Sequence, residues 1–299
     1  MTIQGFRAML KTRQEKIDSL ACVGLDPDPR KMPEGLKSGP REEQIAEDVA
    51  YWMQRIVDAT APYASMFKPQ RAHWEAMVGG EFALRSVIAY IHKHHPDIPV
   101  FLDCKRGDIG KTQARYAEAL WGLDRADGAN FSPYMGNDCM KALIHSDYPG
   151  KGIVGLCYTS NEAARQIQNI RVEHSIATRL WEFVALQTME WADEFGIIDD
   201  AGLVMAAAYR PDKEKEAVFS EHLEIARDLV GDYLWFLIPG IGAQGGEVEQ
   251  TVKNSFAGYG SIAINSSSGI CMASIGDDYE EAAAKAAKNL RNEIRQHMP

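Results

Sequence analysis

The chain lacks the sequence features that direct a protein into or across a membrane. None of its apolar runs approaches the roughly 20 residues that a membrane-spanning helix needs. Residues 1–7 contain no apolar segment of the kind that a signal peptide carries. The five cysteines include no C-x-x-C pair, and most lie in apolar runs, where reduced core thiols are expected. We therefore expect a cytoplasmic protein without a membrane partner.

Positively charged runs are also missing. The sequence has 32 Lys and Arg against 42 Asp and Glu, which gives a net charge of −10. This balance argues against a nucleic-acid partner, so any anionic ligand must be bound by a local pocket. The eight histidines form no H-E-x-x-H motif and no Cys/His spacing typical of a metal site, so we expect no bound metal.

Short apolar runs recur between longer amphipathic stretches. The eight runs are residues 20–25, 64–67, 99–102, 128–131, 152–156, 202–207, 234–238 and 261–264. Runs that are apolar at consecutive positions are typical of a parallel sheet covered on both faces. Helical spacing is found at 42–60, 81–94, 110–120, 173–195 and 280–296. The alternation predicts that residues 1–299 form one α/β domain, a (β/α)₈ TIM barrel, with an open doubly wound sheet as the alternative.

Charged residues follow the apolar runs at the strand ends where a barrel carries its catalytic groups. Asp26 ends the first run and Lys68 the second, and Asp103 and Lys105 end the third. Asp103 and Lys105 are two positions apart, so their side chains project on the same side of a strand. Asp108 follows after a glycine-containing turn, and we expect it to converge with them. Any one of these charges alone is also compatible with an ordinary surface loop.

A glycine-rich segment follows the seventh run. Residues 238–246, Ile-Pro-Gly-Ile-Gly-Ala-Gln-Gly-Gly, match G-x-G-x-x-G. A dinucleotide-binding loop with this pattern belongs to the first βαβ unit and requires an acidic residue after the next strand, whereas the next strand here ends at Asn265. The late position favours a phosphate site, because phosphate in these barrels commonly binds the loops after strands seven and eight. A plain turn is the alternative.

Four motifs occur in order along the chain. They are Phe-Lys-Pro-Gln at 67–70, Phe-Leu-Asp-Cys-Lys-Arg-Gly-Asp-Ile-Gly-Lys-Thr at 101–112, Thr-Ser-Asn at 159–161, and the glycine-rich segment 238–246. Together they resemble the orotidine 5′-phosphate decarboxylase family, above all its longer bacterial branch, over roughly residues 20–273. The resemblance implies a homodimeric barrel that needs no cofactor. Its reaction would convert orotidine 5′-monophosphate to uridine 5′-monophosphate and CO₂, the last step of de novo pyrimidine synthesis.

The resemblance also implies a role for each matching residue. Lys105 would stabilise the carbanion that develops at C6 and then protonate it, and Asp103 would crowd the substrate carboxylate and orient the lysine. An alternating catalytic array would consist of Lys68, Asp103, Lys105 and Asp108. The implied substrate contacts are Asp26 and Lys68 at the ribose hydroxyls, Ser160 at the pyrimidine edge, and Asp108, Ile109 and Thr112 in the partner subunit's site. We expect Gln244, Gly245, Gly246, Ser267 and Ser268 to bind the phosphate, and Pro239 to contact the substrate.

The chain departs from the family pattern after the eighth run. The family carries there an Arg that grips the phosphate, and this chain has Ser268 at the aligned position. Loss of a charge-assisted, bidentate contact should weaken phosphate binding. Two alternatives therefore stay open. One is a related phosphosugar decarboxylase, such as a 3-keto-gulonate 6-phosphate decarboxylase, which uses magnesium, and the other is a non-catalytic nucleotide-binding barrel.

Overall fold

Eight parallel strands form one sheet in the computed structural model, which describes residues 4–39, 41–210, 218–241 and 247–299. Apart from β2 and β3, which end the sheet order, strands that are consecutive in the sequence are neighbours in the sheet, and β8 pairs with β1. The strands are β1 (Ala21–Leu25), β2 (Met66–Pro69), β3 (Phe101–Arg106), β4 (Gly128–Phe131), β5 (Gly152–Tyr158), β6 (Ala201–Met205), β7 (Trp235–Ile238) and β8 (Ile262–Ser266).

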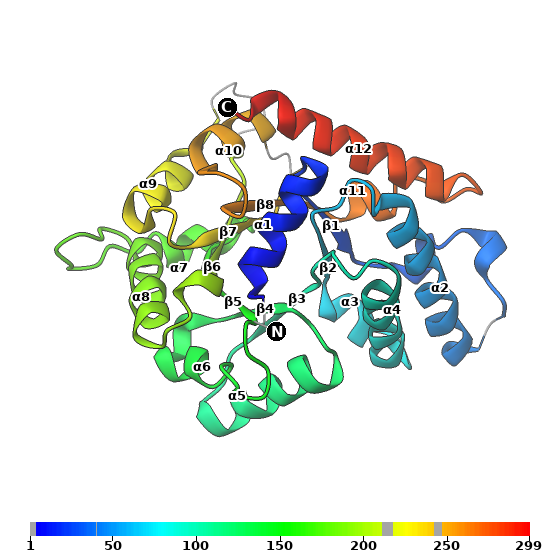
Figure 1. Ribbon diagram of the computed structural model, residues 1–299, viewed down its shortest axis with the longest axis horizontal. Helices are drawn as coiled ribbons and strands as arrows, with labels where there is room; N and C mark the ends of the chain where they lie inside the picture. Colours follow the sequence, from blue (N-terminus) through cyan, green and yellow to red (C-terminus); the bar gives the residue numbers. More distant parts are fainter. Residues whose placement is uncertain (1–3, 40, 211–217, 242–246) are drawn as a thin grey trace.

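The sheet closes into a barrel between β2 and β3. Two isolated parallel bridges join these strands, one between Phe67 and Val100 and one between Gln70 and Asp103. With the β8–β1 pairing, the bridges complete the ring of strands seen in Figure 1. The predicted (β/α)₈ barrel is confirmed, and the open doubly wound alternative is wrong because such a sheet would have two unpaired edges.

Helices surround the ring of strands (Figure 1). In the described part of the chain they are α1 (Phe6–Ile17), α2 (Glu42–Thr60), α3 (Arg71–Glu75), α4 (Gly80–His94), α5 (Gly110–Ala117), α6 (Asn137–Lys141), α7 (Arg165–Gln168), α8 (Leu180–Glu194), α9 (Glu221–Val230), α10 (Val248–Ser255), α11 (Ser268–Cys271) and α12 (Tyr279–His297). The helices predicted at 42–60, 81–94 and 280–296 correspond to α2, α4 and α12, with ends that differ by at most one residue. Among the described helices, none is both long and apolar enough to cross a membrane.

Two predicted helices have different ends in the structure. The helix predicted at 173–195 begins only at Leu180, because Arg171 and Arg179 form an antiparallel bridge before it. The Glu182 carboxylate accepts the backbone N–H of Thr178 at 2.7 Å, in the first turn of α8. The helix predicted at 110–120 is α-helical to Ala117 and continues as a π-helical turn over Glu118–Leu123. Apolar spacing continued through both boundaries, so periodicity alone could not place them.

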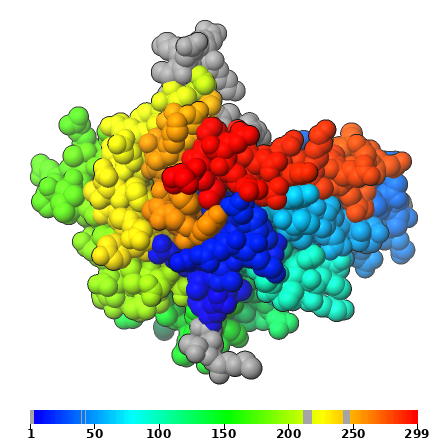
Figure 2. All heavy atoms as spheres, turned by 45° about the horizontal axis from the view of Figure 1, so that its top comes forward, coloured from blue at the N-terminus to red at the C-terminus, as the bar shows by residue number. Residues whose placement is uncertain are grey.

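Helix α1 was not predicted from the sequence, and its side chains fill the N-terminal end of the barrel. Phe6 and Leu10 are fully buried and join the cluster of strand side chains inside the barrel. The Phe6 ring lies 5.3 Å from the Trp235 ring, centroid to centroid. A Cβ on Gly152 would lie 2.6 Å from the Phe6 ring, so the start of β5 requires glycine there. Figure 2 shows the N-terminal segment (blue) covering this end, beside α12 (red). Side chains of α1 thus occupy this end, and a ligand site is expected at the opposite end, where the strands finish.

Candidate active site

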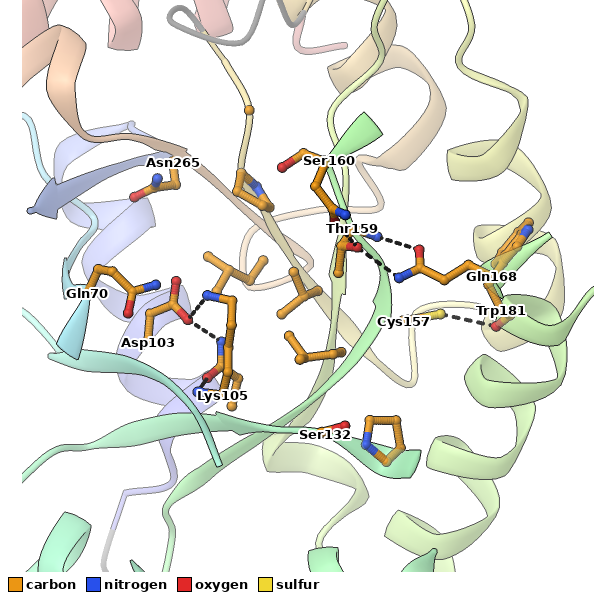
Figure 3. Close-up of a pocket in the computed structure, with 18 of the residues that line it drawn as sticks. Gln70, Asp103, Lys105, Ser132, Cys157, Thr159, Ser160, Gln168, Trp181 and Asn265 are labelled. Atoms are coloured by element: carbon orange, nitrogen blue, oxygen red, sulfur yellow. Dashed lines mark hydrogen bonds and ion pairs between the residues drawn. The ribbon is translucent and has the colours of Figure 1, made fainter. Parts of the chain in front are cut away.

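A cavity of about 1120 Å³ opens where the strands end. Its polar wall contains Asp26, Lys68, Asp103 and Lys105, from the ends of β1, β2 and β3. Its other walls come from the segments that follow β4, β5, β7 and β8. Figure 3 shows Asp103 and Lys105 facing one another across from Ser160 and Thr159. These four strand-end charges thus line one cavity, because parallel strands bring their carboxyl ends to one side of the fold.

Asp103 lies between two lysines. Its Oδ2 is 3.3 Å from Lys68 Nζ, and its Oδ1 is 2.6 Å from Lys105 Nζ. The Lys68 side chain is 4% exposed and that of Asp103 12%, whereas that of Lys105 is 46% exposed. The buried pair thus forms the base of the cavity, and the Lys105 ammonium stands at its surface, where a ligand can contact it.

The charges at the base of the cavity stabilise one another. Burial alone lowers the pKa of Lys68, but the Asp26 and Asp103 carboxylates outweigh it and raise that pKa above its ordinary value. Burial alone raises the pKa of Asp103, but Lys68 and Lys105 outweigh it and lower that pKa to about 2. Both groups are therefore charged at neutral pH, and each depends on the other for its charge.

Lys105 has an unusual backbone conformation. Its φ is 48°, in the left-handed region that non-glycine residues seldom adopt. The pairing of β3 with β4 also shifts register between Leu102 and Arg106. The Asn130 side chain on β4 accepts the backbone N–H groups of Cys104 and Lys105 and donates to Asp103. Asn130 was not among the predicted site residues, although an amide inside the apolar run 128–131 was a signal that could have found it.

The far wall is formed by the segment after β5. Gln168 accepts the backbone N–H of Thr159 at 2.9 Å and donates to its hydroxyl at 2.8 Å, which ties this segment to α7 (Figure 3). Ser160 lines the cavity next to Thr159, and Pro239 lines it from the end of β7. Ser160 and Pro239 thus both line the cavity, and Gln168 is a supporting residue that the sequence did not single out.

The predicted phosphate end is described in part. Ser267 and Ser268 line the cavity after β8, and Gly240 and Ile241 line it after the neighbouring strand β7. Gln244, Gly245 and Gly246 lie outside the described residues. The described residues after β7 and β8 thus line the same cavity, and loops at these two positions commonly bind phosphate in this fold.

Asp108, Ile109 and Thr112 do not line this cavity within one chain. The Asp108 carboxylate accepts the backbone N–H of Ile109 at 2.7 Å, beside the start of α5. Ile109 is 60% exposed, and Thr112 is also exposed. The convergence of Asp108 with Asp103 and Lys105 is therefore not seen inside one subunit, because the chain turns outward after β3.

Comparison with known proteins identifies the family. The sequence model of the orotidine 5′-phosphate decarboxylase / HUMPS family matches residues 19–286. The chain is 39% identical over 290 residues to the orotidine 5′-phosphate decarboxylase of Azoarcus sp. (strain BH72), covering 97% of this chain and 98% of that protein. It is also 39% identical over 291 residues to the enzyme of that name from Dechloromonas aromatica (strain RCB), covering 97% of this chain and 98% of that protein.

Solved structures agree with the sequence relatives. The Leishmania donovani OMP decarboxylase is 29% identical with a TM-score of 0.75, and the match covers 98% of this chain and all of that one. The UMP synthase of the same organism is 30% identical with a TM-score of 0.76, and the match covers 98% of this chain and 57% of that one. With its strand-end lysine and carboxylate groups in one cavity and relatives matched over almost its whole length, the chain belongs to the orotidine 5′-phosphate decarboxylase family.

Proposed function

We propose that this protein is a carbon–carbon lyase that converts orotidine 5′-monophosphate to uridine 5′-monophosphate and CO₂ in pyrimidine biosynthesis, with Lys105 as the proton donor. The observation that carries the proposal is the contact of one carboxylate, Asp103, with two lysines at the base of the cavity. The reaction breaks the bond between C6 and the carboxylate carbon and leaves the electron pair on C6. Such a carbanion is poorly delocalised, so a fixed positive charge near C6 lowers the barrier.

Lys105 is suited to both parts of this step. Its ammonium is held by Asp103 at 2.6 Å, so its position is set before the substrate binds. As CO₂ leaves, the ammonium stabilises the growing negative charge and then transfers one proton to C6, which yields the product. The neutral amine regains a proton from water, because the Lys105 side chain is 46% exposed. Proton donation by a positioned side chain typically contributes about 10²–10⁴-fold to the rate.

Asp103 and Lys68 support Lys105 in this proposal. Lys68 is buried and paired with Asp103, so the carboxylate keeps its charge when substrate displaces water from the cavity. A charged Asp103 prevents Lys105 from turning toward the substrate carboxylate and away from C6. Asp26 accepts the backbone N–H of Gln70 at 3.2 Å, which fixes it beside Lys68, where both can contact the ribose hydroxyls.

We further propose a homodimer in which Asp108, Ile109 and Thr112 complete the partner subunit's site. Large apolar side chains are exposed on the segments that follow β3 and β4, namely Ile109 at 60%, Tyr134 at 89% and Met135 at 43%. Tyr134 also lines the cavity, so this apolar surface is continuous with the active-site mouth. Burial of such side chains against a second copy would favour association and would close the cavity.

Our proposal for the compartment is the cytoplasm. All five cysteines are unpaired and buried, which suits a reducing environment. We also propose that residues 1–299 act as one domain, since the barrel is completed by strands from both ends of the chain.

The test is the absorbance change of orotidine 5′-monophosphate with purified protein, with and without a chelator. We expect conversion to uridine 5′-monophosphate that the chelator does not affect. We expect Lys105→Ala to abolish it with an unchanged circular dichroism spectrum, while Lys285→Ala, which removes an exposed lysine of α12, retains it. Turnover of Lys105→Ala near that of the wild type would contradict the proposed role of Lys105.

The same assay separates the alternatives. The matched family also includes the HUMPS group. Activity on a phosphosugar would therefore point to the magnesium-dependent reaction if the chelator abolishes that activity. Binding of orotidine 5′-monophosphate without conversion at saturating concentration would point to a non-catalytic barrel.

A further inference from the structure

The pairing of β3 with β4 is interrupted opposite one residue, Asn130. Phe101 pairs with Gly128 and Leu102 with Ala129, and the next pair is Arg106 with Phe131. Residues 103–105 of β3 therefore face a single residue of β4. Lys105 turns into the left-handed region at φ 48° within this interruption. The N–H groups of Cys104 and Lys105 need other acceptors, because both lie outside the regular ladder.

The Asn130 side chain supplies the acceptor. Its Oδ1 accepts the N–H of Cys104 at 3.0 Å and the N–H of Lys105 at 2.7 Å. Two donors on one oxygen fix the orientation of the amide, because an NH₂ group cannot accept a hydrogen bond. The Nδ2 group therefore points the other way, and it donates to Asp103 Oδ1 at 2.6 Å. Asn130 is 1% exposed, so water does not replace these contacts.

Asp103 Oδ1 is thus shared by the Asn130 amide and the Lys105 ammonium, each at 2.6 Å. One side chain determines both the backbone turn that carries Lys105 and the carboxylate that holds its ammonium. We propose that Asn130 is the positioning residue that fixes Lys105 and Asp103 in the geometry required for proton transfer. This inference rests on the function proposed above.

Other side chains at position 130 would fail in distinct ways. Alanine removes the acceptor and the donor together and leaves the buried N–H of Cys104 and the partly buried N–H of Lys105 without this acceptor. Aspartate keeps an acceptor of the same size but places a second carboxylate against Asp103, and like charges in one site raise the pKa of one of them. The two substitutions therefore separate loss of the backbone contacts from loss of the contact with Asp103.

The experiment compares Asn130→Ala, Asn130→Asp and the control Gln14→Ala. Gln14 is also a fully buried amide that bridges backbone groups, since it donates to Ile262 O at 2.8 Å and accepts from Gly260 N at 2.7 Å. It belongs to α1 and contacts the chain at the start of β8, and it does not line the cavity. The measurements are kcat and KM for orotidine 5′-monophosphate, the pH profile of kcat, and the melting temperature of each protein.

We expect Asn130→Ala to lower kcat roughly 100-fold, while KM changes by less than about threefold, because displacement of a catalytic group by about 1 Å acts mainly on the transition state. We expect Gln14→Ala to have a lower melting temperature than the wild type but a kcat within about twofold of it. We expect Asn130→Asp to move the acidic limb of the kcat profile to higher pH. Should Asn130→Ala fail to fold, Asn130→Asp carries the test, because it keeps the size of the side chain and both backbone contacts.

The inference is overturned if the folded Asn130 variants keep kcat within about threefold of the wild type with an unmoved acidic limb, or if Gln14→Ala loses as much kcat as Asn130→Ala. Failure of the proposed function is a different result, because the wild type would then not convert the substrate. In that case a crystal structure of Asn130→Ala decides the inference. Departure of Lys105 from its left-handed conformation supports it, and retention of that conformation and of the 2.6 Å contact with Asp103 overturns it.

Discussion

Gly24 on β1 lies directly against Ser267 in the loop after β8. A Cβ on Gly24 would be 2.8 Å from Ser267 Cα and nearer still to its side chain, so no other residue fits without moving the loop. Gly24 is also paired with Lys68 in the strand register. The first strand therefore determines how closely the loop after β8 approaches Lys68, and with it the position of Ser267 and Ser268 at the proposed phosphate end.

Substitution of this glycine should weaken substrate binding. We expect Gly24→Ala to raise KM for orotidine 5′-monophosphate about tenfold, because overpacking typically costs about 1–3 kcal/mol and here the strain is relieved by moving the loop. The control is Gly35→Ala, where the nearest atom to the added Cβ is Asp277 Oδ1, at an ordinary contact distance of 3.7 Å. Steady-state kinetics on both variants measure the effect. An unchanged KM for Gly24→Ala would show that the loop after β8 does not contact the phosphate.

Restoring the family arginine should strengthen binding. We expect Ser268→Arg to lower KM about tenfold or more, because a charge-assisted hydrogen bond to phosphate contributes about 1.5–3 kcal/mol. Ser268 begins α11 and lines the cavity, so a longer side chain there reaches into it. The dependence of KM on salt concentration should also steepen. If KM stays the same or rises, another residue already binds the phosphate in place of the family arginine.

Mixing two inactive variants tests the proposed sharing of sites. In a homodimer that places Asp108 in the partner's cavity, a mixed dimer of Lys105→Ala and Asp108→Ala contains one intact site. Random exchange makes half of the dimers mixed, so we expect about a quarter of the wild-type activity after subunit exchange. Asp108 does not line the cavity of its own chain, which is the observation behind this expectation.

The matched control for this experiment is a mixture of Lys105→Ala and Asp103→Ala. Asp103 and Lys105 contact one another within one chain, so no combination of these subunits rebuilds a complete site. We expect no recovered activity in the control. Recovery in the control, or none in the Lys105→Ala and Asp108→Ala mixture, would contradict the shared-site proposal.

The buried His222 should make the fold sensitive to mild acid. Its ring is fully buried, its Nε2 lies 2.7 Å from Ala206 O, and burial lowers its pKa from 6.5 to about 4. The unfolded chain therefore binds a proton that the folded chain does not. The neutral His222 therefore contributes about 3 kcal/mol to the free energy of unfolding. This contribution is fully present above about pH 6.5 and is lost as the pH falls toward 4.

Denaturant unfolding at pH 7 and at pH 4.5 checks this expectation. We expect His222→Phe to be less stable at both values, because Ala206 O loses its partner, but to lose less free energy of unfolding between them than the wild type does. His94→Gln, which changes an exposed histidine of α4, should keep the wild-type difference. Equal pH dependence in wild type and His222→Phe would show that His222 does not titrate on unfolding.

The sequence revealed which charges line the cavity because the relevant signal was local. Asp26, Lys68, Asp103 and Lys105 each follow an apolar run, and parallel strands in a barrel bring such positions to one end. The direction taken by Asp108 was not predictable from this rule, because it depends on a turn after β3 that leads out of the cavity. Asp108 follows Lys105 by only three positions, but β3 ends at Arg106, so the strand no longer determines where the Asp108 side chain points.

What the sequence alone determined is the order of strands and helices and the chemistry at the strand ends. Tertiary structure alone decided that Phe6 fills the N-terminal end of the barrel. It also decided that the Asn130 side chain accepts the backbone N–H groups of Cys104 and Lys105 where the pairing of β3 with β4 is interrupted. The physical reason is that the periodicity of apolar residues shows only which face of a helix or strand is buried. It does not identify the partner of a buried group. The buried Asn130 amide, for example, accepts the N–H of Lys105, which lies 25 residues away on another strand, and only folding brings the two together.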